Sequence, residues 1–297
     1  MERSIVYAAD QLLPGQKVRG FLKGKGYSTQ SLKALKQDAE AIRVNGEPVF
    51  LNHVLQLGDQ VSVRIRDMGN SDQILPVKLP VDIVYEDEDL LVVNKAAGMP
   101  IHPSFGNRDN TLGNALAWYF QEKGVPFVFR CMNRLDRDTS GLTVVAKHMV
   151  SAGMLQGSIS REYLAIVKGE VTPEQGTIDA PIGRKESSCL ERKIDFSHGE
   201  RAVTHYRVLE KRSGHSLVLL RLETGRTHQI RVHMEYLGFP LIGDYLYHPD
   251  RTHIQRQALH AYRISFPQPM TGEKLVFTAP LPQDMRSVWE KFRVQNI

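Results

Sequence analysis

The sequence predicts an α+β fold in which a small N-terminal domain precedes a larger domain with a largely antiparallel, mixed central sheet. After residue 80, strand-like runs outnumber helical patterns and do not alternate strictly with them, as a doubly wound sheet would require. Before residue 69, two helical patterns precede strand patterns. A chain of 297 residues is long enough for two domains. A stretch rich in Gly, Asn, Ser, Asp and Pro lies between them, so we expect domains over 1–68 and 81–297, joined by a linker over 69–80.

The N-terminal domain is predicted to contain two short helices followed by a small sheet. Apolar residues recur at helical spacing over 18–22, and again over 32–39, where Leu32, Leu35 and Ala39 would share a face. Ser28 can cap the second helix. Asn45 and Gly46 predict a tight hairpin turn between two strands, and residues 61–65 alternate as a further strand.

The larger domain is predicted to be rich in strands, with helices over 112–122 and 284–292. The predicted strands cover residues 83–85, 90–93, 142–146, 163–167, 202–209 and 217–222.

Positive charge is concentrated near the N-terminus. The formal net charge is +5 and the pI about 9.1, a mild excess that is also common in proteins that bind no polyanion. Residues 11–37 contain no acid, so this segment is either a solvated helical face or a surface that contacts phosphates. The basic residues expected to contact RNA there are Lys17, Arg19, Lys23, Lys25, Lys33 and Lys36.

Cysteine usage and hydropathy indicate a cytoplasmic protein. Cys131 and Cys189 lie far apart and have no metal-binding partner spacing, so neither a zinc module nor a disulfide framework is expected. No signal pattern occurs at residues 1–4, and no run of about 18 apolar residues occurs anywhere. We expect a monomer with no membrane contact.

An aspartate flanked by two arginines is the most informative feature of the chain. Asp136 lies just before a turn and the predicted strand over 142–146, and a carboxylate there could act as a nucleophile, a base or a metal ligand. Asp136, Asp138, Ser140 and Gly141 imitate the start of a calcium loop. The twelfth position of such a loop should be Glu and is Lys147, and a strand follows instead of a helix, so calcium is not expected.

Three segments, 133–142, 161–169 and 224–233, resemble in order the motifs of the RluA/RluD-type pseudouridine synthases. Supporting matches occur over 199–206, 238–245 and 259–261, and the resemblance spans roughly 81–282. It implies the pseudouridine synthase fold and isomerisation of uridine in structured RNA without a cofactor, with large-subunit ribosomal RNA as the first expected substrate and tRNA as an open alternative. The N-terminal part resembles the S4-like (αL) RNA-binding module.

The resemblance also implies roles for individual residues. Asp136 would be the nucleophile, Tyr163 would pack on the base and transfer a proton, and Arg226 would pair with the aspartate. Arg134, two residues before Asp136 in an extended segment, would point to the same side and contact phosphate or fill the gap left by an everted uridine. Ile230 would line the uracil pocket or pack in the core. The further residues expected to contact RNA are Arg137, His228 and Arg231.

Three other positions receive structural interpretations. Asn133 stands where the family usually has histidine, and its amide can still orient a neighbouring loop, so we favour a structural role. Asp244 is expected to be a turn residue. His228 and His233 lack the zinc-protease spacing, so a metal is not expected and hydrogen bonding within the site or to RNA is favoured.

Two other functions compete with this interpretation. A non-catalytic RNA-binding or ribosome-assembly protein could retain this fold, but it predicts losses among Asp136, Tyr163 and Arg226, and none is lost. A nucleoside or glycoside hydrolase needs a second carboxylate about 5 Å away. Glu162 adjoins Tyr163 and should point to the opposite face of its strand, so no such partner is evident.

Overall fold

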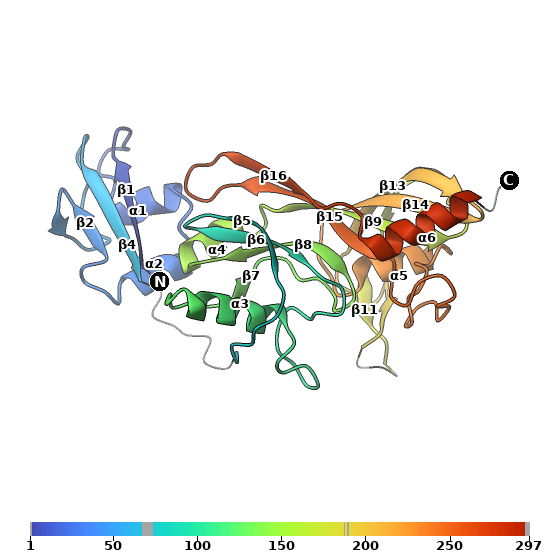
Figure 1. The fold of residues 1–297 in the computed structure, drawn as a ribbon. Coiled ribbons are helices and arrows are strands. Elements are labelled where there is room, and N and C mark those ends of the chain that lie inside the picture. The colour runs from blue at the N-terminus through green and yellow to red at the C-terminus, as the bar shows by residue number, and fades with distance from the viewer. Residues whose placement is uncertain (1, 67–73, 187, 189, 295–297) are drawn as a thin grey trace.

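The computed structural model describes residues 2–66, 74–186, 188 and 190–294 (Figure 1). The chain forms a four-stranded N-terminal sheet, a ten-stranded central sheet and a two-stranded hairpin in the described part. No helix in these ranges is long and apolar enough to cross a membrane.

The N-terminal unit, residues 2–66, is a four-stranded sheet packed against two helices. The sheet has the order β1 (Glu2–Ala8), β4 (Gln60–Arg66), β2 (Ile42–Val44) and β3 (Glu47–Pro48), and the helices are α1 (Val18–Gly24) and α2 (Thr29–Leu35). The predicted helices and hairpin are confirmed: the side chain of Ser28 accepts a hydrogen bond from Ser31 N, and Asn45 and Gly46 both have positive φ.

Two details of this unit differ from the prediction. The sequence pattern did not predict β1. This strand pairs with β4 along its whole length, but Ile5 is its one buried residue, so the alternation of apolar and polar residues is weak. Helix α2 ends at Leu35, and Ala39 is exposed rather than on the buried face of the helix.

The central sheet is largely antiparallel, and among the pairings in the described residues only β8 with β15 is parallel. Its main path runs through β10 (Gln175–Asp179), β13 (Val203–Arg212), β14 (His215–Leu222), β9 (Ser160–Lys168), β15 (Leu259–Pro267), β8 (Ser140–Ala146), β6 (Leu90–Lys95) and β5 (Asp82–Glu86). β16 (Lys274–Thr278) pairs with β15, β7 (Arg130–Cys131) pairs with β8, and β11 (Ile182–Arg184) forms a separate hairpin with β12 (Arg192–Ile194). This architecture confirms the predicted α+β fold.

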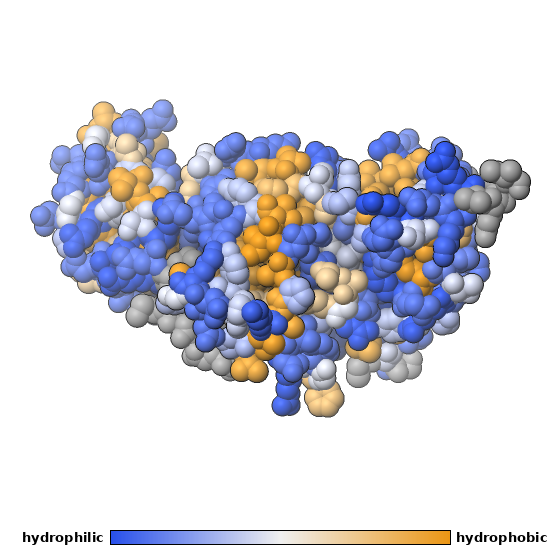
Figure 2. All heavy atoms as spheres, in the orientation of Figure 1, coloured by the Kyte–Doolittle hydropathy of each residue, from blue (hydrophilic) through white to orange (hydrophobic). Residues whose placement is uncertain are grey.

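Helices cover both faces of the central sheet. α3 (Leu112–Glu122) and α5 (Gln229–Tyr236) contribute to one core with the sheet, whereas α6 (Gln283–Val294) packs against Ile166 on the other side. A further short helix, α4 (Met149–Leu155), follows β8. The sequence predicted α3 and α6 and missed the two shorter helices. On the face shown in Figure 2, hydrophilic side chains cover most of the N-terminal unit, and apolar side chains gather across the middle of the molecule.

The parallel contact between β8 and β15 requires a glycine. Gly141 lies opposite Ala261 and has φ +112°, and a Cβ at this position would lie 2.3 Å from the Ala261 carbonyl oxygen. No L side chain fits there without moving the backbone. Gly141 therefore allows the strand that follows Asp136 to lie directly against the middle of the sheet.

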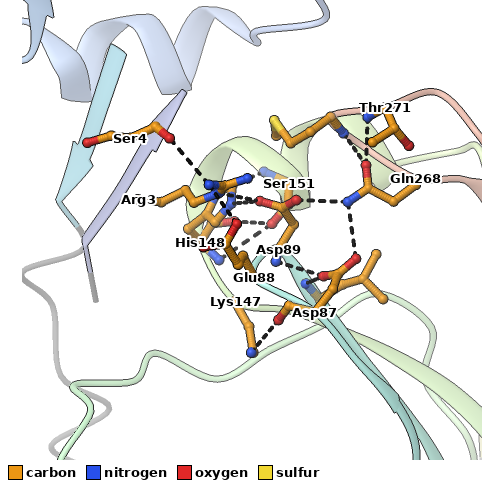
Figure 3. A network of polar contacts seen from close by, with 12 residues as sticks. Arg3, Ser4, Asp87, Glu88, Asp89, Lys147, His148, Ser151, Gln268 and Thr271 are labelled. Carbon is orange, nitrogen blue, oxygen red and sulfur yellow. Dashed lines mark hydrogen bonds and ion pairs between the residues drawn. The ribbon is translucent and has the colours of Figure 1, made fainter. Parts of the chain in front are cut away.

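The N-terminal unit is attached to the rest of the chain through a buried carboxylate, Asp89 (Figure 3). Arg3 donates from Nε to Asp89 at 3.1 Å, and His148 and Gln268 contact the same carboxylate at 3.0 and 2.8 Å. Burial opposes ionisation of Asp89, but these hydrogen bonds together lower its pKa. Val150 of α4 also belongs to the apolar core of the N-terminal unit. The contact therefore combines ion pairing with apolar packing.

The predicted linker is only partly described. Residues 69–73 lie outside the described residues, and the next residues are tied to α3, because Asn114 donates to Leu75 O and its own carbonyl accepts from Val77 N. The division into domains at 68 and 81 stays a prediction.

Candidate active site

A cavity of about 490 Å³ opens where β9, β14, the start of α5 and the loop before β8 meet. Its lining includes Asn133 and seven of the residues predicted to act in catalysis or RNA binding, namely Arg134, Asp136, Tyr163, Arg226, His228, Ile230 and Arg231. Arg137 is not among the lining residues and instead pairs with Asp138 at the surface. The six predicted basic residues of the N-terminal unit are all exposed and lie outside this cavity.

The loop that carries Asp136 is fixed on three sides by polar side chains. Asn133 donates to Leu142 O and accepts from Val144 N, so its buried amide joins the loop to β8. Lys95 donates to Arg137 O at 3.0 Å, and Arg256 donates to Asp138 O at 3.0 Å. Asn133 thus has the kind of structural contact that the sequence favoured, and Asp136 is held on a rigid turn.

Lys95 is buried and also donates to Ala96 O and Met99 O, both at 2.8 Å. Burial lowers its pKa to about 7, although Asp138 and Asp136 act in the opposite direction. The sequence reasoning missed Lys95. Its signal was a charged residue at the end of the buried apolar run of β6.

Replacing Lys95 by methionine is expected to lower the free energy of unfolding by about 1–3 kcal/mol, because buried carbonyls lose their donor. In the wild type the folded chain releases the Lys95 proton near pH 7, well below the ordinary pKa of 10.5 in the unfolded chain. The unfolded chain then binds more protons between these pH values, so stability should rise with pH, by at most about 1.4 kcal/mol per pH unit. Denaturant unfolding from pH 6.5 to 9.5 measures this. Parallel pH profiles for wild type and variant would contradict the assignment.

Arg231, rather than Arg226, is the arginine that pairs with Asp136. Arg231 Nη1 lies 3.1 Å from Asp136 Oδ2, and its other nitrogens hold Asp244 in a two-point contact at 2.7 Å each. Arg231 and Asp244 are 2% and 1% exposed, so this pair is desolvated. Although burial acts against it, pairing with Asp244 and Asp136 raises the pKa of Arg231 and keeps it a cation.

This geometry corrects one expectation and extends another. The predicted contact between Arg226 and Asp136 is wrong: Arg226 pairs with the exposed Glu200 and donates to Arg201 O at 3.0 Å. Asp244 does accept from the backbone of Leu246, as a turn residue would, but it is also the buried counter-ion of Arg231. The sequence signal for Arg231 was a charged residue between two apolar residues of a helix.

Tyr163 lines the same cavity from β9 and is almost completely buried. Burial raises the pKa of its phenol, which Arg161 lowers and Asp136 raises further. The phenol therefore stays protonated at neutral pH. Tyr163 lines the same cavity as Ile230, and an aromatic ring there suits packing against a flat base.

His228 lies in the left-handed region, with φ 58°, at the start of α5. Its Nδ1 is 2.9 Å from the Tyr247 hydroxyl and its Nε2 is 3.8 Å from Asp136 Oδ2. Burial lowers the pKa of His228, and burial raises the pKa of Tyr247 to about 12, so both are neutral at pH 7. The Tyr247 hydroxyl also accepts a hydrogen bond from Arg192 N at 2.9 Å, which fixes the phenol beside His228.

His233 lies outside the site chemistry. Its ring is fully buried and contacts Thr204 Oγ1 and Ala180 O at 2.8 and 2.9 Å. Among the described residues, no group of three or more His, Cys, Asp or Glu side chains could hold a metal. Cys131 is a free thiol, and Cys189 lies outside the described residues.

The site and fold define a class of RNA-modifying protein, and comparison with known proteins gives the family. Residues 89–236 match the RNA pseudouridylate synthase family model. The chain is 42% identical over 265 residues to an uncharacterized RNA pseudouridine synthase of Bacillus subtilis (strain 168), YjbO, covering 88% of this chain and 93% of that protein. It is 44% identical over 242 residues to ribosomal large subunit pseudouridine synthase D of Zymomonas mobilis subsp. mobilis (strain ATCC 31821 / ZM4 / CP4), covering 74% and 75%.

A solved structure agrees with these matches. Human RNA pseudouridylate synthase domain containing 1 superposes with a TM-score of 0.57 at 29% identity, covering 72% of this chain and 95% of that one. The chain therefore belongs to the RluA/RluD-type family and is an RNA pseudouridine synthase, an isomerase. This confirms the family and the enzyme class that the sequence predicted.

Proposed function

We propose that this enzyme isomerises uridines in large-subunit ribosomal RNA, with Asp136 as nucleophile acting on a uridine flipped out of its stack. The supporting observation is the contact of the Asp136 carboxylate with the buried Arg231 guanidinium, on the wall of a cavity that also contains Tyr163. The substrate class is taken from relatives such as the Zymomonas mobilis protein, whose name specifies the ribosomal large subunit.

In the proposed reaction, the Asp136 carboxylate bonds to C1′ of the ribose as the bond from C1′ to uracil N1 breaks. The uracil turns, C5 bonds to C1′, and the Asp136 carboxylate leaves. The proton on C5 is lost and N1 gains one, so the product is an isomer and no other reactant is consumed. Arg231 fixes the direction of the carboxylate, which the two-point contact with Asp244 reinforces.

Other residues of the cavity would bind and position the nucleotide. Tyr163 would pack on the uracil. Because its phenol is protonated, it would take the proton from C5 only as it gives its own proton to uracil N1. Ile230 would form the apolar wall. Arg134 is exposed at the rim and donates to Thr227 at 3.1 Å, a position from which it would contact phosphate or fill the gap left by the flipped base.

Pseudouridine mapping tests this proposal. Total ribosomal RNA and tRNA from cells with and without this gene would be compared site by site. We expect one or a few pseudouridines of large-subunit RNA to disappear without the gene and to return with the wild-type gene. Loss confined to tRNA would contradict the substrate class, and a return with Asp136→Asn would contradict the nucleophile.

We further propose that the six exposed basic residues predicted in the N-terminal unit bind the same RNA, as its S4-like pattern suggests. Changing Lys23, Lys33 and Lys36 together to glutamine is expected to weaken binding and to reduce the slope of log K against log salt by about 3, because each lost phosphate contact reduces it by about 1. The titration would be repeated at several salt concentrations with the transcribed ribosomal fragment. Arg43→Gln is the matched control, since Arg43 lies in the same unit but already pairs with Glu40. Equal salt slopes for the triple variant and the wild type would show that these three lysines do not contact RNA phosphates.

A further inference from the structure

A second cavity, of about 410 Å³, adjoins the catalytic cavity. It is lined by the end of α4, the loop that leads into β9, and the end of β14. The two cavities share the lining residues Met132, Asn133, Arg161 and Leu222, so they form one continuous groove. Arg161 stands at the junction, and nothing in the chemistry above uses it.

The guanidinium of Arg161 has no counter-ion among the residues that the structure describes. Its Nε is buried and has no hydrogen-bond partner, and none of its nitrogens contacts a carboxylate of the described residues. This differs from Arg231 and Arg256, whose guanidinium groups are each held by a carboxylate in a two-point contact. Arg161 is half-buried, and a buried N–H donor without an acceptor costs free energy, which an anion that enters the groove would offset.

The backbone directs Arg161 into the groove. Arg161 lies two residues before Tyr163 on β9, so both side chains leave the same face of the sheet. The facing loop carries Gly225, where a Cβ would lie 3.0 Å from Arg161 Nη1. The missing side chain at Gly225 leaves room for the guanidinium. The one carboxylate residue that lines the second cavity, Glu223, already pairs with Arg201 and His205.

We propose that Arg161 binds the phosphodiester that joins the target uridine to its neighbour, and that the second cavity receives this neighbouring nucleotide. This rests on the proposed function, in which the uridine occupies the first cavity. A phosphate between two nucleotides in one continuous groove falls at the junction of the two cavities, where Arg161 is. The planar guanidinium fork matches two phosphate oxygens, and a cavity of this size accommodates a nucleotide. The exposed Arg221 on the wall of the second cavity adds positive charge there.

Arg161→Gln tests the proposal with RNA stem-loops that contain the mapped target uridine. We expect Kd to rise by about 10- to 100-fold and the salt slope to fall by about 1, with little change in kcat. Arg161→Lys should retain the salt slope, because the charge remains. The matched control is Arg263→Gln, which lies opposite Glu162 on the neighbouring strand and pairs with it. Because the Arg161 guanidinium makes no ion pair with another described residue, the melting temperature of the Arg161→Gln variant should equal that of the wild type. A large drop in melting temperature would overturn the proposal in favour of a structural role.

An uncharged internucleotide linkage in the RNA identifies which phosphate Arg161 contacts. Stem-loops would carry one methylphosphonate on the 5′ or the 3′ side of the target. If Arg161 binds that phosphate, the neutral linkage and Arg161→Gln weaken binding no more together than either does alone. Additive losses at both positions would overturn the proposal. Binding is measured separately from turnover, so failure of the Asp136 assignment would show as unchanged product formation in Asp136→Asn, whereas failure of this proposal would show as additivity.

Discussion

Changing Asp136 to asparagine is expected to abolish pseudouridine formation while leaving the fold and RNA affinity nearly intact. The amide keeps the shape of the side chain and can still accept a hydrogen bond from Arg231 at the 3.1 Å position, but it is a poor nucleophile. Removal of a nucleophile lowers kcat by roughly 10⁵-fold or more in well-studied enzymes. The measurement is product formation under single-turnover conditions, with RNA affinity determined on the same samples.

Affinity and melting temperature serve as the controls for this variant. Asp136 is partly exposed on a turn held by Lys95, Arg256 and Asn133, and these contacts do not use its side chain. Stability should therefore change little. Turnover within about tenfold of the wild type would show that another group attacks the ribose, because the expected loss is several orders of magnitude larger.

The sequence predicted the fold and most of the cavity lining because these depend on patterns that lie close together in the chain. Helix α3, the hairpin at Asn45 and the strands β5, β6, β8, β9, β13 and β14 follow local periodicity and turn chemistry, whereas β7, β10, β15 and β16 were not predicted. The motifs around Asp136, Tyr163 and Ile230 come together because β8, β9 and α5 all begin beside the same cavity.

The parts that could not be predicted depend on contacts between distant residues. Strand β1 has little alternation, and only its pairing with β4, about 60 residues later, makes it a strand. Whether Arg226 or Arg231 faces Asp136 is decided by helix α5, which starts at Gln229 and buries Arg231 against Asp244. A motif read in order cannot distinguish two arginines five residues apart when the turn between them is unknown.

Changing Arg231 to methionine is expected to lower the free energy of unfolding by about 3–5 kcal/mol, because Asp244 would remain buried without its counter-ion. Activity should also fall, by about 10²- to 10³-fold in folded protein, since the carboxylate of Asp136 loses the donor that fixes its direction. Denaturant unfolding and single-turnover kinetics measure the two effects. Arg231→Lys should recover part of the stability but little activity, because an ammonium cannot make both contacts of the guanidinium fork.

Arg226→Met is the matched control. It tests whether Asp136 depends on Arg231, as the structure indicates, or on Arg226, as the sequence motif implied. Arg226 and Glu200 form a surface pair whose side chains are 39% and 71% exposed, so its removal should cost no more than about 1 kcal/mol of stability. Because Arg226 lines the cavity mouth, its loss should raise KM for RNA more than it lowers kcat. A loss of kcat in Arg226→Met as large as that in Arg231→Met would show that Arg226 pairs with Asp136 in the complex with RNA, as the sequence motif implied. That result would mean that Arg226 leaves Glu200 for Asp136 when the substrate binds.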